Sequence, residues 1–436
     1  MKKYILIYIL SSIVVSQYWN FFHSEELKKY QKYNTNFEEI DRIAQLKINQ
    51  NNHSRNALTH EIVGYLPYWE YSTYPNLDFS LITQLNYFSA ELNQYGEITN
   101  NHNWDNLYLI EYAQNYGVKV KLCVTLFGEN ELNILLSNSE YRENAINNIL
   151  EKILLQNANG VDINFELLPS SQRNNLVVFM EELSNTLHQF IDNPIITMAT
   201  PAIDWNNAWD YHSLAEITDG LFIMGYNYFY SGSSFAGPVS PLGEYYYDLE
   251  YTINDYLNKT ENQTDKLILG LPYYGYNWPV INNNINSETI DNGNAETYYS
   301  INNLLDNNAN NWHANTNSLW FSYADNNWWQ CWYDDSLSLS NKYEFAKNNN
   351  LKGIGIWALG YDSGHQELWN AIAEKFITQL VGDLNLDNLT NILDVIVMIN
   401  MILEFIESSD TADLNEDQII NIIDVITLIN IILAQY

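Results

Sequence analysis

The segment 159–166 carries the residues best suited to acid–base chemistry. Its sequence, Asn-Gly-Val-Asp-Ile-Asn-Phe-Glu, alternates polar and apolar side chains, so in a strand Asp162, Asn164 and Glu166 share one face. Polar groups on a buried face are costly unless they are used. We therefore interpret Glu166 as the candidate general acid, with Asn164 and Asp162 as catalytic partners. A salt-bridged structural carboxylate is the alternative, which the scarcity of Lys and Arg disfavours.

Oxygen-bearing side chains recur near the C-terminus with an offset of 413 − 383 = 30 residues. They occupy positions 1, 3, 5, 9 and 12 of two loops, a pattern that suits Ca²⁺. The alternative is a pair of acidic N-capped helices that bind no metal. We expect two calcium sites and no cofactor for catalysis. The expected ligands are Asp383, Asn385, Asp387, Asn391 and Asp394 in the first loop, and Asp413, Asn415, Asp417, Asn421 and Asp424 in the second.

Eight short runs rich in β-branched and aromatic residues are predicted strands, and one of them carries Asp162 and Asn164 and leads directly into Glu166. They lie at residues 62–65, 85–88, 120–125, 161–165, 195–199, 221–224, 267–271 and 353–357. Amphipathic stretches separate them, and alternating strands and helices predict an α/β fold, a closed parallel (β/α)₈ TIM barrel. We place this body at 59–378, with a small α/β insertion at about 278–350 between strands seven and eight. A doubly wound open sheet is the alternative.

The two ends of the chain differ from this body. Residues 1–16 have the basic start, apolar run and small-residue end of a signal peptide, and residues 17–58 form a polar leader or linker. We expect a secreted or cell-surface protein, with membrane contact only if the N-terminal segment stays uncleaved as an anchor. Residues 379–436 contain no Lys or Arg and form a separate, all-α, EF-hand-like module.

The composition restricts the ligand class. With 19 basic and 53 acidic residues the net charge is −34, which repels nucleic acid, so we expect no nucleic-acid partner. No arginine follows Arg173, which disfavours bidentate binding of a strongly anionic ligand. The chain has 34 Tyr, 16 Phe and 13 Trp, whose flat rings suit stacking on neutral sugars.

The motif at 159–166 resembles the Asp-Gly-x-x-Asp-x-Asp-x-Glu-type signature of glycoside hydrolase family 18, the chitinase family. Other segments resemble that family's strands in order. These are residues 64–69, 122–128, 224–227, 270–275 and 353–357. The stretch 332–336 with Lys342 is most similar to the branch that contains spore-cortex-lytic and chitinase-domain-like proteins.

The resemblance implies a hydrolase of β-1,4-linked N-acetylglucosamine glycans, chitin or related, that uses substrate-assisted retaining catalysis. In that scheme the substrate's own acetamido oxygen attacks the anomeric carbon. Glu166 then protonates the leaving oxygen and later activates water, while Tyr226 hydrogen-bonds the acetamido carbonyl. The resemblance further implies a set of substrate-binding residues, namely Trp357, Met224, Asn227, Tyr65 and Trp69.

One position departs from the family. Asn164 stands where the family usually has Asp, so the group that orients the acetamido N–H has lost its charge. Glycoside hydrolase family 85, another acetamido-assisted class, uses Asn in this role. The alternative functions are a catalytically impaired, lectin-like carbohydrate-binding barrel, or a scaffold-docking or adhesion protein with an inert barrel.

The duplicated C-terminal loop, with Asp at position 12, resembles a type I dockerin. This resemblance implies docking onto a cohesin-bearing protein. Positions 10 and 11 of the loops are Ile392-Leu393 and Ile422-Ile423. We expect these apolar pairs to form either a docking face or an intramodular core.

Overall fold

The structure is a computed structural model that describes residues 22–33, 35–48, 57–305, 309–378, 380–385 and 389–434. The chain divides into two compact units, Met1–Arg55 with His60–Lys375 and Asn56–Thr59 with Phe376–Tyr436. The predicted signal peptide lies outside the described residues. None of the helices in the described part has both the length and the apolar character needed to cross a bilayer.

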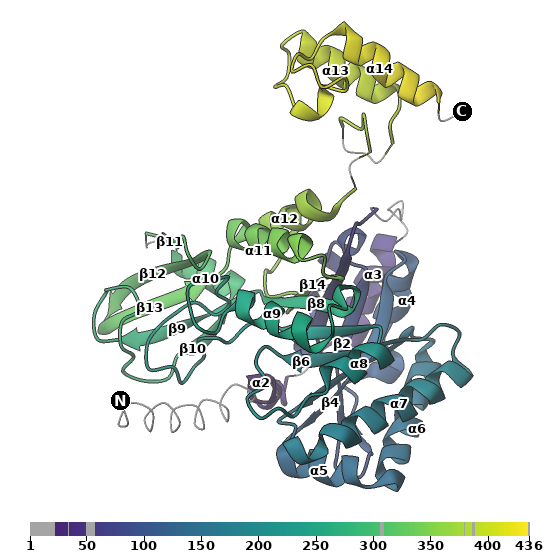
Figure 1. The fold of residues 1–436 in the computed structure, drawn as a ribbon, viewed down its shortest axis with the longest axis vertical. Coiled ribbons are helices and arrows are strands. Elements are labelled where there is room, and N and C mark those ends of the chain that lie inside the picture. Colours follow the sequence, from purple (N-terminus) through teal and green to yellow (C-terminus); the bar gives the residue numbers. More distant parts are fainter. Residues whose placement is uncertain are drawn as a thin grey trace. The chain divides into compact units, whose positions relative to one another are not determined.

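Eight parallel strands form the barrel of the first unit (Figure 1). Strand β1 pairs with both β2 and β14, which closes the sheet. The predicted closed barrel is therefore confirmed, and the doubly wound open sheet is wrong. A short strand, β3 (Ile98–Asn100), extends β2 in antiparallel fashion. The barrel strands are β1 (Glu61–Pro67), β2 (Gln84–Leu92), β4 (Lys119–Phe127), β5 (Gly160–Glu166), β6 (Ile195–Pro201), β7 (Gly220–Met224), β8 (Leu267–Pro272) and β14 (Gly353–Trp357).

Aromatic and glycine residues share the barrel interior. Phe222 on β7 packs edge-on against Tyr65, with ring centroids 4.7 Å apart. A Cβ at Gly355 would lie 1.9 Å from the Phe222 ring, and one at Gly270 would lie 2.4 Å from it. The glycines on β8 and β14 thus leave the space that the Phe222 ring fills.

Helices cover the outside of the barrel, and caps define their ends. The longest of the β4–β5 helices starts after Asn138, whose side chain accepts from the Glu140 N–H, and it ends at Asn157 in the left-handed region (φ 51°). The helices of this unit that follow β3 are α4 (Leu109–Asn115), α5 (Glu129–Ser137), α6 (Ser139–Gln156), α7 (Arg173–Phe190), α8 (Tyr211–Ile217), α9 (Leu249–Lys259), α10 (Tyr298–Leu305), α11 (Ser336–Asn348) and α12 (Gln366–Phe376).

Between β8 and β14 the chain builds a second, five-stranded antiparallel sheet in the order β10-β9-β13-β12-β11 (green in Figure 1). Its first strand begins two residues after β8 ends, so Tyr274 and Tyr276 lie next to the C-terminal end of the barrel. The strands are β9 (Tyr274–Val280), β10 (Asn294–Thr297), β11 (Asn311–His313), β12 (Ser318–Asp325) and β13 (Asn327–Tyr333).

Among the described residues before the barrel, the helices are α2 (Phe22–Tyr30) and α3 (Phe37–Ile48). Helix α3 packs on the 3₁₀ segment Tyr68–Asn76. The hydroxyls of Tyr71 and Tyr74 both donate to Asp41 Oδ1, at 2.6 and 2.7 Å. This part of the leader therefore packs onto the barrel.

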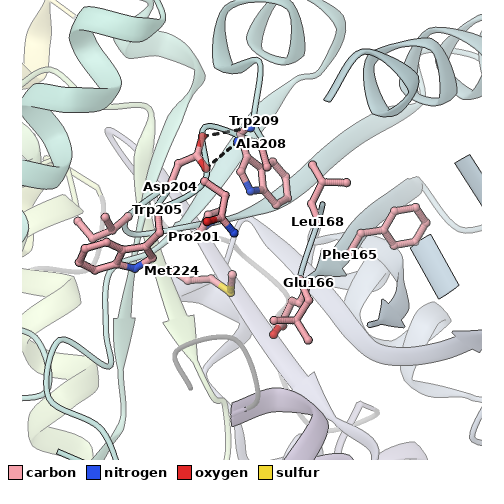
Figure 2. Close-up of a pocket in the computed structure, with 12 residues that line it drawn as sticks. Phe165, Glu166, Leu168, Pro201, Asp204, Trp205, Ala208, Trp209 and Met224 are labelled. Carbon is pink, nitrogen blue, oxygen red and sulfur yellow. Dashed lines mark hydrogen bonds between the residues drawn. The ribbon is translucent and has the colours of Figure 1, made fainter. Parts of the chain in front are cut away.

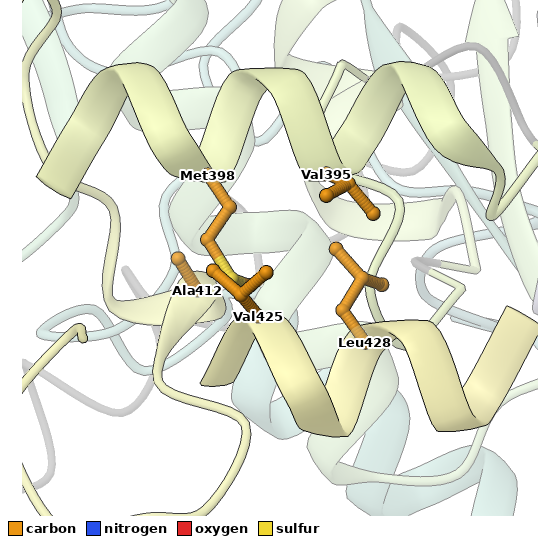
Figure 3. Packing of buried hydrophobic residues seen from close by; sticks show 5 residues of the cluster. All are labelled: Val395, Met398, Ala412, Val425 and Leu428. Atoms are coloured by element: carbon orange, nitrogen blue, oxygen red, sulfur yellow. The ribbon is translucent and has the colours of Figure 1, made fainter. Parts of the chain in front are cut away.

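The α-helices of the second unit, within its described residues, are α13 (Ile392–Ile402) and α14 (Ile422–Leu433). They pack on a small core of Val395, Met398, Ala412, Val425 and Leu428 (Figure 3). The pairs at 392–393 and 422–423 are exposed, so the intramodular-core interpretation of these four residues is wrong.

Candidate active site

Strand β5 presents the predicted carboxylate motif to the barrel interior. Asp162, Asn164 and Glu166 are all buried, and parallel pairing sets them opposite Cys123, Thr125 and Phe127 of β4. The side chains therefore rise in steps toward the C-terminal end of the strand, where barrel enzymes carry their sites.

Asp162, the lowest of the three, is held by a buried polar network. The Tyr65 hydroxyl donates to its Oδ2 at 2.6 Å, and the Thr197 hydroxyl donates to its Oδ1 at 2.5 Å. Lys121, fully buried, donates to Thr197 at 2.6 Å. Burial lowers the pKa of Lys121 to about 8, while the nearby Asp162 opposes this shift. Sequence reasoning missed Lys121 and Thr197, although a lysine within an apolar strand pattern is a signal for such a network.

Asn164 lies one step higher and differs from its neighbours. Its Oδ1 is buried and, among the described residues, accepts no hydrogen bond. A buried acceptor without a donor costs free energy of roughly 1–3 kcal/mol. The amide oxygen is therefore available to a donor that a ligand would bring.

Glu166 is at the top of the strand and contacts a residue from the leader. Its Oε1 lies 2.5 Å from His23 Nδ1. The other ring nitrogen, His23 Nε2, is 3.3 Å from the Tyr226 hydroxyl. Burial, with Glu166 nearby, raises the pKa of Tyr226 well above its usual value, so the phenol remains a protonated donor.

Trp357, at the end of β14, forms one wall beside these groups. Its ring centroid is 4.0 Å from that of His23, and its Nε1 donates to Glu26 Oε2 at 3.1 Å. The Tyr361 hydroxyl donates to Glu26 Oε1 at 2.5 Å. The structure thus brings Glu166, Tyr226 and Trp357 around a single side chain, that of His23.

The other predicted binding residues lie around the same opening. Met224, Asn227, Tyr226 and Glu166 line one cavity of about 20 Å³. Asn227 Oδ1 accepts from the Tyr274 hydroxyl at 2.6 Å. Trp69 lies on the Tyr361 side of the site, and its Nε1 donates to the Tyr361 hydroxyl at 3.3 Å. Tyr65 instead lies below, on Asp162, so it positions a carboxylate in this structure.

A second small cavity adjoins Glu166 on the β6 side (Figure 2). The side chains of Glu166, Met224 and Trp205 surround it, and its volume is about 20 Å³. Asp204 shapes its wall by accepting from the backbone N–H groups of Ala208 and Trp209, at 2.9 and 3.1 Å.

Sequence reasoning missed the residues that α2 brings to the site, His23 and Glu26. The spacing of Phe22, Glu26, Leu27 and Tyr30 follows one face of a helix. That pattern could have indicated a buried helix, but it says nothing of which distant residues the helix contacts.

The predicted calcium ligands show the same 30-residue repeat in their hydrogen bonds. Asp394 accepts from the backbone N–H groups of residues 384, 385 and 391, and Asp424 accepts from those of 414, 415 and 421. Asn391 and Asn421 cap α13 and α14. Asp387 lies outside the described residues.

The second loop allows a test of whether these residues fit a calcium ion. Its candidate donors are all oxygens, which suits a hard cation. Asp413 accepts from the N–H groups of Asp417 and Gln418. Within the described ranges no three Asp, Glu, His or Cys side chains gather as metal ligands do. The oxygen ligands of this loop therefore fit calcium in their chemistry. In this structure the Asp413 carboxylate instead accepts hydrogen bonds from backbone amides.

The fold and the site define the class of this protein. It is a parallel (β/α)₈ barrel with an inserted antiparallel sheet, and a buried carboxylic acid lies at the C-terminal end of its fourth strand. The model of the glycosyl hydrolases family 18 matches residues 61–362. The chain belongs to this family.

Curated proteins from Bacillus subtilis and from human are similar to this chain in sequence. A putative sporulation-specific glycosylase, YdhD, of Bacillus subtilis is 28% identical over 249 residues, covering 53% of this chain and 54% of the relative. The cortical fragment-lytic enzyme of the same organism is 26% identical over 255 residues and covers 56% of each chain. The chain thus spans about half the length of these two relatives. Human di-N-acetylchitobiase is 23% identical over 305 residues, covering 62% of this chain and 76% of the relative.

Solved structures show the same fold. A GH18 chitinase from Cycas revoluta in complex with (GlcNAc)3 has a TM-score of 0.66 at 20% identity, covering 72% of this chain and 99% of that one. The crystal structure of YdhD has a TM-score of 0.55 at 24% identity, covering 62% of this chain and 89% of that one.

Proposed function

We propose that this protein hydrolyses β-1,4-linked N-acetylglucosamine glycans, chitin or related, by substrate-assisted retaining catalysis. The observation that carries the proposal is the buried ladder of Asp162, Asn164 and Glu166 beneath Tyr226 and Trp357. Family membership supports it, as do relatives named as a glycosylase and a chitobiase.

Each side chain has a role in this proposal. Glu166 donates a proton to the glycosidic oxygen as the substrate's acetamido carbonyl attacks the anomeric carbon, and it then takes a proton from the water that opens the oxazolinium ion. Asn164 Oδ1 accepts from the acetamido N–H, which satisfies its unpaired oxygen. Tyr226 donates to the acetamido carbonyl, and Trp357 supports the reacting sugar.

Hydrolysis of fluorogenic chitooligosaccharides by the full chain tests the proposal. Glu166→Gln should lower kcat by at least a hundredfold, because general acid–base catalysis contributes about that much or more. Glu181→Gln, a change of the same chemistry on α7 outside the barrel, should leave kcat unchanged. Equal turnover by the wild type and Glu166→Gln would contradict an acid–base role.

The neutral Asn164 favours a second candidate, a lectin-like barrel with little turnover. Charge-assisted hydrogen bonds exceed neutral ones by about 1–2 kcal/mol. Under the hydrolase proposal, the wild type has a measurable kcat, and Asn164→Asp should therefore raise it by roughly tenfold. A wild type that binds chitotetraose without turnover, and gains turnover only as Asn164→Asp, would instead favour the lectin-like function.

We further propose that the protein is exported and that residues 379–436 act as a calcium-binding dockerin module. The 30-residue repeat of oxygen ligands supports calcium binding. The exposed apolar pairs at 392–393 and 422–423 supply a surface for a cohesin-bearing partner. The N-terminal sequence supports secretion to the medium or cell surface.

A further inference from the structure

Helix α2 lies inside the cleft that the proposed function assigns to the glycan. Its residues Phe22, His23, Ser24, Glu26 and Leu27 are buried. The helix belongs to the same compact unit as the barrel. It also lies beside the barrel strands in Figure 1, although the long segment 31–159 separates it from β5 in the sequence.

The middle of α2 bonds to the polar groups of the site. His23 contacts Glu166 at 2.5 Å and Tyr226 at 3.3 Å, so one imidazole engages both the proposed acid and the proposed acetamido donor. Glu26, one turn farther along, accepts from Trp357 and Tyr361. These are the hydrogen-bonding positions that a sugar and its acetamido group would need.

Both ends of α2 stack on aromatic rings that flank the site. Phe22 stacks on Tyr274, with centroids 4.7 Å apart and planes 15° apart. Tyr30 stacks on Trp69, with centroids 4.6 Å apart and planes 11° apart. Face-to-face contact with a flat ring is also how aromatic side chains hold sugars. The helix therefore covers the cleft along its length.

Little room remains at the acid when α2 is in place. The cavity beside Glu166, Met224 and Tyr226 measures about 20 Å³, which is room for a water molecule. Two larger cavities of about 430 Å³ lie on opposite faces of α2, one along Glu26 and Tyr276 and the other along Leu27 and Phe127. Residues of α2 line both cavities, so the helix fills the space between them.

We propose that α2 is an autoinhibitory plug, and that the protein binds glycan only after Phe22–Tyr30 leaves the cleft. This inference rests on the proposed function for the identity of the ligand that competes with α2. The contacts of α2 with the site are independent of that function. Residues 31–33, which follow the helix, are exposed. A cut in this connection would release α2 while α3 stays bound through Asp41.

The test compares two double variants of the full chain. His23→Ala/Tyr30→Ala removes the contacts with Glu166 and Trp69. Glu25→Ala/Lys28→Ala alters two exposed residues of the same helix and is the matched control, because all four positions become alanine, a good helix former. Thermal unfolding confirms that each variant is folded.

The first readout is binding of chitotetraose, followed by tryptophan fluorescence within the mixing time and before turnover. A plug that closes the cleft most of the time lowers the apparent affinity by the fraction of open molecules. His23→Ala/Tyr30→Ala should therefore bind at least tenfold more tightly than the wild type, and the control should match the wild type. Equal affinities for all three proteins would overturn the plug.

The second readout is amide hydrogen exchange of residues 22–30, which needs no sugar binding. These amides should exchange slowly in the wild type and in the control, and rapidly in His23→Ala/Tyr30→Ala. Equally rapid exchange in all three proteins would overturn the plug. A third outcome is that exchange is faster only in His23→Ala/Tyr30→Ala and that none of the three proteins binds chitotetraose. This outcome would mean that α2 occupies a cleft for another ligand, and it would refute the proposed substrate instead.

Discussion

At the scale of single residues, the site depends on how buried charges are compensated. In the part of the chain that the structure describes, Asp162 forms no direct ion pair, and the buried Lys121 is linked to it through the Thr197 hydroxyl. The sequence motif was enough to predict that Asp162, Asn164 and Glu166 share the interior face. It could not predict the role of Lys121, because this lysine lies on the neighbouring strand β4 and donates to Thr197 on β6, on the other side of β5.

The compensation of Asp162 by Lys121 can be measured. Lys121→Met should lower the free energy of unfolding by roughly 3 kcal/mol at pH 7, because removing one partner of a buried charged pair leaves the other uncompensated. Denaturant unfolding of the full chain gives this value. Adding Asp162→Asn to Lys121→Met should recover much of the loss. An equal or larger loss in the double variant would show that Lys121 acts through packing alone.

At the scale of elements, strands and inserted helices differ in what the local sequence reveals. All eight predicted barrel strands are present. Short apolar runs of this kind are typical of parallel strands, because such strands are buried on both faces of the sheet. The leader was interpreted as a linker, and the position of α2 was not predicted. Its stability comes from Tyr274, Trp357 and Trp69, which are far away in the sequence.

The docking of α2 should depend on pH through Glu26. Burial raises the pKa of Glu26 to about 7 from 4.5. Trp357 and Tyr361 donate hydrogen bonds to this carboxyl. The other titratable groups near it are His23, Lys29 and Tyr30 on α2, and Glu70, Tyr226, Tyr274 and Tyr276 on the elements packed against the helix. Protonation therefore favours the docked helix. This advantage is complete below about pH 4.5 and is lost as the pH rises through about 7.

Chitotetraose should accordingly bind the wild type more weakly at pH 5 than at pH 8, by up to roughly a hundredfold. Fluorescence titration at the two pH values measures the ratio. Glu26→Gln should reduce the ratio severalfold, and His23→Ala/Tyr30→Ala supplies the pH dependence of the open cleft for comparison. A wild-type ratio no larger than that of the open variant would argue against protonation of Glu26 as the cause.

At the scale of the whole molecule, the chain joins a barrel to a small unit with a different basis for stability. The second unit has a core of only a few apolar side chains, and its loops are held by Asp394 and Asp424. Small units of this kind commonly need additional stabilisation. The sequence repeat predicted the loops and helices, but the repeat alone could not establish whether the oxygens bind a cation.

Removal of calcium tests this second unit within the full chain. Ligand binding to the native state stabilises it by about 2.7 kcal/mol per site at a hundred times the dissociation constant. Scanning calorimetry in CaCl₂ should therefore show a transition that EDTA shifts down by several degrees. Asp417→Asn should reduce this shift, and Glu416→Gln, its neighbour in the same loop, should not. Identical traces with CaCl₂ and EDTA would favour the metal-free interpretation.

The covalent attachment of α2 has a kinetic consequence. A separate inhibitor dissociates on dilution, but a tethered helix has a local concentration that the connecting chain sets, in the millimolar range for a short flexible linker. The proportion of closed molecules should therefore be the same in a dilute solution as in a concentrated stock. A molecule that has lost α2 cannot close again, so a single cut would act as a permanent switch and would produce a lag before the reaction reaches its full rate.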